Sequence, residues 1–191
     1  MNVRTLIAGA LGGLVVFIWL SISWMALPFH GESLNGIQHN AQLDAMLIQL
    51  GAKDGLNYYP SYEGMELQEY SALAKSVPNI GIMSYHRDGF DMDNPMAYIR
   101  GLLGCIIAGI LVATLLGVLP AGSSMAGRIL FCTLFGAAAF FCTQWVSGGF
   151  FHFPMRHTML ELMDGVISWT LAGVVMAFIL RRAPFARDAA R

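Results

Sequence analysis

Charged residues are scarce in this chain of 191 residues, since Asp, Glu, Lys and Arg make up only 12% of it and 56% of the chain is hydrophobic. A soluble domain of this length carries roughly twice that charged fraction. The shortage of charge therefore excludes an ordinary soluble domain. It also excludes a nucleic-acid-binding surface, because the few clustered arginines lie next to an apolar run.

Cysteine is almost as rare, with only Cys105, Cys132 and Cys142, all within apolar runs. A disulfide framework is excluded for the polar part of the chain, and no CxxC pattern indicates a redox or zinc motif. The sequence also lacks a nucleophile motif, a phosphate-binding loop and a CxxCH haem attachment site. We therefore predict that the chain is not an enzyme and has no catalytic residues.

Long hydrophobic runs are what the sequence has instead, at approximately residues 5–27, 99–119, 128–148 and 159–180. Each is close to the roughly 20 residues that a helix needs to cross a bilayer. They predict an integral α-helical membrane protein with four transmembrane helices. The first run is longer than a secretory h-region, and cleavage after Ala26 would place Trp24 where a small residue is needed. Residues 1–28 are therefore predicted to be an uncleaved signal anchor.

Charge asymmetry predicts the orientation of these spans. Nine of the twelve acidic residues lie in 29–98, whereas residues 183–191 and the two positions before them carry four arginines. Basic residues near spans stay on the cytoplasmic side. We therefore expect both termini in the cytoplasm of a bacterial inner membrane, with 29–98 as a periplasmic domain and 99–182 as the last three transmembrane helices.

The predicted periplasmic domain has the pattern of a small α/β fold. Residues 41–51 and 65–76 have helical spacing, and Asn40 is a plausible cap for the first of these helices. Residues 56–60 and 79–87 read as strands, the second closed by an Asp88-Gly89 turn. Two short helices and two short strands form only a small hydrophobic core. We therefore expect this domain to rest on the membrane or on a partner.

Small residues recur every four positions along the spans. The positions are Gly101, Cys105, Gly109, Ala113 and Gly117 in the second span and Gly9 and Gly13 in the first. Such stripes let helix backbones approach closely in lipid. They predict that the spans pack tightly against other helices. These helices would belong to the same chain, to a second copy of it, or to other membrane-protein subunits.

The stretch FFHFPMRHTMLELMDG (150–165) combines several metal-binding residue types. His152, Met155, His157 and Met159 predict a copper site, because thioether and imidazole suit Cu(I), with help from His30. Alternatively, a divalent ion would suit His157, Glu161 and Asp164, which share one helix face at spacing i, i+4, i+7.

A structural interpretation competes with the metal site. Thr158 and Glu161 have capping-box spacing, which would account for Glu161 without a ligand. Asp164 lies inside the span and needs a partner. We expect that partner to be His157, Arg156 or an arginine such as Arg87 or Arg100. Asp164, Glu161 and Arg100 would then be structural polar residues at the membrane interface.

Four stretches carry a resemblance to a known family: SWMALPFH, GLNYYP, PNIGIMSYHRDG and DGVISWTLAGVVMA. With them the chain resembles a family of small bacterial four-span inner-membrane proteins that have an outward α/β insertion. The resemblance implies this architecture for most of the chain. It implies no activity and no site residues.

Taken together, the patterns favour a non-catalytic accessory or structural subunit of a larger bacterial membrane complex, respiratory or photosynthetic, with no cofactor of its own. A periplasm-facing copper-binding protein is the first alternative. A small ion-coupled transporter is the second, and Glu161 and Asp164 would then be its coupling carboxylates.

Overall fold

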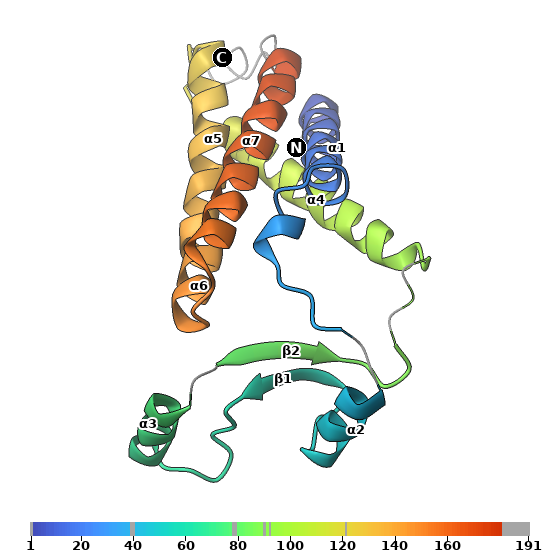
Figure 1. The fold of residues 1–191 in the computed structure, drawn as a ribbon. Coiled ribbons are helices and arrows are strands. Elements are labelled where there is room, and N and C mark those ends of the chain that lie inside the picture. Colours follow the sequence, from blue (N-terminus) through green and yellow to red (C-terminus); the bar gives the residue numbers. More distant parts are fainter. Residues whose placement is uncertain are drawn as a thin grey trace. The chain divides into compact units, whose positions relative to one another are not determined.

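The computed structural model describes residues 2–38, 41–77, 80–89, 91, 93–120 and 122–180. Four helices are long and apolar enough to cross a membrane. They are α1 (Val3–Met25), α4 (Met96–Leu116), the helix Met125–Phe150 and α7 (Met155–Leu180) (Figure 1). The prediction of a four-span helical membrane protein is confirmed at this level. The arginine-rich tail, 181–191, lies outside the described residues.

The third span is interrupted. It begins as α5 (Met125–Phe140), capped by the Ser124 hydroxyl, which accepts from the Gly127 N–H at 3.0 Å. It continues through a π-helical turn, Phe141–Trp145, into α6 (Val146–Phe150). Turns of this kind are rare in proteins, and many of those that occur lie at functional sites.

The chain divides into two compact units. The first holds the long helices and comprises Met1–Leu34, Asn94–Val146 and Pro154–Arg191. Within it, α1 packs against α4 and α7, and α7 packs against α1 and α5. Its apolar core lies towards one end of the bundle, where Ala8, Leu116, Cys132 and Met176 are fully buried.

Glycines set the contact between α1 and α4. A Cβ atom added at Gly109 would lie 2.6 Å from the backbone nitrogen of Gly13 and 2.9 Å from its Cα. A Cβ at Gly9 would meet the backbone of Ile110 at similarly short range. The predicted close packing is therefore confirmed, and the partner of this small-residue face is another span of the same chain.

Close packing at glycines also joins α5 to α7. A Cβ at Gly136 would lie 2.8 Å from Cδ1 of Trp169, and one at Gly173 would lie 2.8 Å from Cβ of Cys132. The helices α5 and α7 therefore lie against each other at backbone distance.

The second unit, Asn35–Asp93 with Ser147–Phe153, contains the shorter elements. They are α2 (Ala41–Gln49), β1 (Gly55–Tyr59), α3 (Leu67–Ser76) and β2 (Gly81–Tyr85). The strands pair antiparallel, with Gly55 opposite Tyr85 and Tyr59 opposite Gly81. Each element coincides with a predicted helix or strand to within a few residues, although the predicted cap Asn40 lies outside the described residues. No residue of α2 or α3 is buried, so this unit has little core.

The start of α7 differs from the prediction. The helix begins at Met155, and both the N–H and the hydroxyl of Thr158 donate to the carbonyl of Pro154, at 3.1 and 3.3 Å. Thr158 therefore lies inside the first turn and caps nothing, so the predicted Thr158–Glu161 capping box is wrong. Because the helix starts earlier, the Glu161 carboxylate is not used at its end.

We predict that Gly109→Ala lowers the free energy of unfolding by about 1–3 kcal/mol, because the added methyl group collides with the Gly13 backbone. The matched control is Gly104→Ala on the same helix, where an added Cβ meets nothing within 4 Å. Denaturant titration of the protein in detergent micelles measures both. Equal effects of the two substitutions would contradict the assigned contact.

Candidate metal-binding site

A buried carboxylate lies where α1 ends and α7 begins. Asp164 on α7 is 2% exposed. Its Oδ1 accepts hydrogen bonds from the Ser23 hydroxyl at 2.7 Å and from Nε1 of Trp19 at 3.0 Å, and its Oδ2 lies 3.0 Å from Nε2 of His30. A carboxylate at membrane depth needs such partners. Asp164 therefore ties α7 to α1 and to the segment that follows it.

The partners expected from the sequence for Asp164 were wrong. Arg156 instead pairs with Glu32, with Nη2 and Oε2 2.6 Å apart and both side chains more than half exposed. An exposed pair of this kind contributes at most about 1 kcal/mol. Arg100 is exposed on α4. One feature of the sequence pointed to the observed partners. Trp19 and Ser23 both carry hydrogen-bond donors and lie four residues apart, on one face of the first span.

Hydrogen bonding fixes the tautomer of His30. The Ser23 hydroxyl donates its hydrogen to Asp164, so it can only accept from the imidazole, whose Nε2 lies 3.2 Å away. Nε2 of His30 therefore carries the proton and donates to Asp164. In the neutral ring Nδ1 then has the lone pair, as in histidines that bind a metal through one nitrogen and a carboxylate through the other.

That lone pair has no partner among the described residues. His30 is 1% exposed, and its Nδ1 is a buried polar atom without a hydrogen bond there. The ring is held in place by Trp24, which stacks on it with centroids 4.1 Å apart and planes 12° apart. A short 3-10 helix, Gly31–Ser33, follows, and the Ser33 hydroxyl donates to the His30 carbonyl at 2.8 Å. A rigid, buried acceptor is thus left for a ligand.

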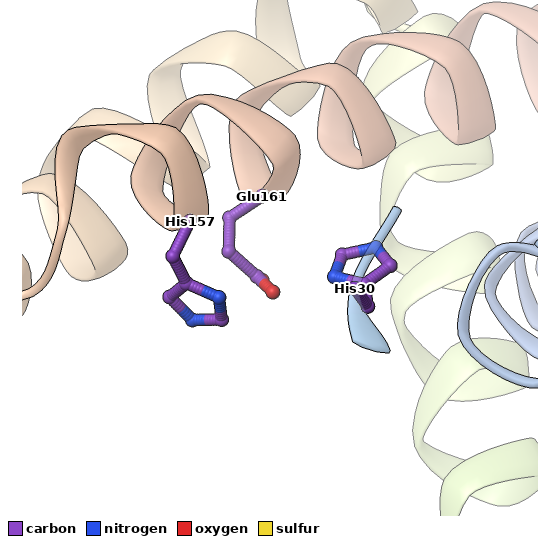
Figure 2. A group of neighbouring side chains, drawn as sticks. All are labelled: His30, His157 and Glu161. Atoms are coloured by element: carbon purple, nitrogen blue, oxygen red, sulfur yellow. The ribbon is translucent and has the colours of Figure 1, made fainter. Parts of the chain in front are cut away.

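Two further metal-ligating side chains face this nitrogen. His157 and Glu161 lie one turn apart on α7, and one ligand atom from each of His30, His157 and Glu161 lies within 4.8 Å of the others. Figure 2 shows the Glu161 carboxylate between the two imidazole rings. The Ser33 hydroxyl lies 3.3 Å from Nδ1 of His157, and Trp24 packs edge-on against the same ring. The grouping of His157 with Glu161 was predicted for a divalent ion, and His30 was predicted to assist His157 in the copper alternative; the fold brings all three together.

Glu161 has no hydrogen bond to its carboxylate among the described residues, although its side chain is partly buried. An unpaired carboxylate at this depth is unfavourable, and a cation would relieve it. Two imidazoles and one carboxylate form a donor set that zinc uses. Ligand atoms around a tetrahedral zinc ion are roughly 3.4 Å apart, so closing the site requires movements on the order of 1 Å.

The other residues predicted for a copper site lie elsewhere. Because α7 is helical from Met155, Met155 and Met159 are each two residues from His157 and point about 160° away from it around the helix. Their side chains are 62% and 38% exposed. His152 belongs to the second compact unit, in a left-handed conformation with φ 53°.

A cavity of about 180 Å³ adjoins the buried carboxylate. Its wall is formed by α1, by α5 with its π-helical turn, and by α7. Glu161 and Asp164 line it, together with Gln144 from the π-helical turn and apolar residues such as Val16 and Trp169. The candidate metal site and the cavity therefore share Glu161.

Comparison with protein-family models, with curated proteins and with solved structures found no match to this chain. The chemistry of the site is therefore inferred from the positions and types of its side chains alone.

We predict that Asp164→Asn lowers the free energy of unfolding by about 3 kcal/mol, because the amide presents a donor to groups that already donate. Glu32→Gln is the control, since it removes an exposed pair and changes stability by less than about 1 kcal/mol. Denaturant titration in micelles measures both. An Asp164→Asn protein as stable as the parent would show that the three hydrogen bonds do not hold α7 to α1.

Proposed function

We propose that this chain is a multi-pass membrane protein that binds a zinc ion where α1 ends and α7 begins, through Nδ1 of His30, His157 and Glu161. The observation that carries the proposal is the buried Nδ1 of His30, which has no hydrogen-bond partner among the described residues, beside the Glu161 carboxylate, to which none of these residues donates. Both anomalies are resolved by a single cation.

Zinc fits better than copper(I). The donor atoms are two imidazole nitrogens and a carboxylate oxygen, whereas copper(I) favours sulfur. The methionines that could supply sulfur lie on another side of α7. Three protein ligands also leave a fourth coordination position open.

Asp164 supports such a site without binding the metal. By accepting a hydrogen bond from Nε2 it orients the His30 ring, the role that outer carboxylates have at zinc sites. Its own oxygens are already occupied by three donors. This arrangement favours metal binding over a transport role in which Asp164 would have to release its partners.

The charge distribution of the sequence supports an orientation. We place this end of the bundle, with the acidic segment 29–98, in the periplasm of a bacterial inner membrane, and both termini in the cytoplasm. A site at that face would exchange metal with the periplasm.

We predict stoichiometric Zn²⁺ binding by the purified protein after chelator treatment, measured by isothermal titration calorimetry. His157→Ala and Glu161→Gln should each weaken binding by at least about tenfold to a hundredfold, because each removes a ligand or its charge. Met159→Leu is the matched control on the same helix and should bind normally.

Two results would contradict the zinc proposal. One is a chelator-treated parent protein that binds no Zn²⁺ in the titration. The other is tight Cu(I) binding that Met159→Leu removes and Glu161→Gln does not, which would restore the copper hypothesis.

A second candidate is an accessory subunit of a larger membrane complex. The small-residue faces no longer support it, because the spans use them on one another. The second compact unit does support it: a two-stranded sheet with two short helices is marginal alone, and Leu56 and Leu67 are 74% and 80% exposed on it.

For that candidate we predict that the tagged chain, extracted in mild detergent, migrates on a native gel well above its 20.8 kDa. Leu67→Asp should shift it to the monomer position, because the charge disrupts an apolar contact. Lys75→Asp, an exposed change on the same helix, should not. Monomeric migration of the parent chain after cross-linking would remove this candidate.

A further inference from the structure

The cavity beside Asp164 contains polar groups that the metal site does not use. Gln144 lines it, and its side-chain amide has no hydrogen-bond partner among the described residues. The π-helical turn Phe141–Trp145 places this amide in the cavity wall, between α1 and α7. Gln144 is exposed, so its amide is free to bond a ligand at the rim of the cavity.

Most of the cavity wall is apolar. Val16 and Leu20 come from α1, Phe140 from α5 and Trp169 from α7, and Gly136 and Gly165 leave room between them. The polar lining residues are Thr143, Gln144, Glu161, Asp164 and Ser168. A ligand that fits this wall is therefore an apolar molecule with hydrogen-bonding atoms at a few positions.

The size of the cavity limits the ligand. A protein cavity of about 150 Å³ accommodates benzene. At about 180 Å³ this cavity accommodates a single six-membered ring with small substituents, and it is open on one side, so a tail can leave it. Its lining residues Ala139, Thr143 and Gln144 on the third span are exposed, and this span is apolar enough to lie in lipid.

We propose that this cavity binds the head group of a membrane-dissolved quinol, a six-membered ring with hydroxyl groups and an apolar tail. The Glu161 carboxylate accepts from one hydroxyl and the Gln144 amide bonds the oxygen on the other side, while Phe140 and Trp169 contact the ring. The tail leaves through the open side. This is a binding function in addition to the proposed zinc site, and Gln144 belongs to it alone.

The test is a titration of the full-length protein in detergent micelles with decylubiquinol under anaerobic conditions, followed by native mass spectrometry. We expect saturable binding of a single molecule. Decylbenzene, which has a ring and a tail but no oxygen, should not compete, because it cannot bond to Glu161 or Gln144.

Variants separate the cavity from the metal site. Gln144→Leu should raise the Kd for decylubiquinol by about tenfold, the effect of one lost hydrogen bond. Ala139→Leu should abolish binding by filling the cavity. Both should still bind zinc, which shows that they are folded. Leu134→Ala, on the exposed side of α5, is the control and should bind like the parent. His157→Ala should lose zinc and keep quinol.

Three outcomes would overturn the proposal: no saturable decylubiquinol binding by the parent, equal competition by decylbenzene, or unchanged affinity in Gln144→Leu. Displacement of the quinol by phosphatidylglycerol at equal concentration would also overturn it, since a phospholipid would then be the natural occupant.

Discussion

A carboxylate within a membrane helix is unfavourable unless hydrogen-bond donors surround it. Asp164 has three such donors: Trp19 and Ser23 on α1, and His30 shortly after that helix. This network fixes three things together. It holds α7 against α1, it brings His30 back towards the bundle, and it settles which nitrogen of that ring carries a proton. The unpartnered Nδ1 of His30, and with it the proposed zinc site, exists because Asp164 has taken the other nitrogen.

The glycine contacts make this arrangement possible. Gly9, Gly13 and Gly109 bring α1 and α4 to backbone distance, and Gly136 does the same for α5 and α7. Packing of this kind compensates in lipid for the missing hydrophobic effect between helices. It stabilises the apolar end of the bundle, so the opposite end can hold polar side chains. The tight contacts also leave a gap over α7, between α1 and the π-helical turn, which becomes the cavity.

Glu161 links the two proposals. It contributes to the His30–His157 cluster and lines the cavity, and no described residue donates to it. A metal ion and a quinol hydroxyl are both able to satisfy it. Binding of either would therefore influence the other through one shared carboxylate, a direct coupling that needs no movement of the helices.

The sequence by itself determined the four spans, the small-residue stripes and the presence of a carboxylate that needed a partner, because apolar length, four-residue spacing and the energy of a buried charge are local properties. It also placed His157 and Glu161 on one face, since helical periodicity relates residues one turn apart. Only the tertiary structure decided that Trp19, Ser23 and His30 are the partners of Asp164, because they come from α1 and the residues after it, more than 130 positions away. The fold likewise decided that α7 begins at Met155, which separates the methionines from His157 and leaves two imidazoles and a carboxylate as the neighbouring groups.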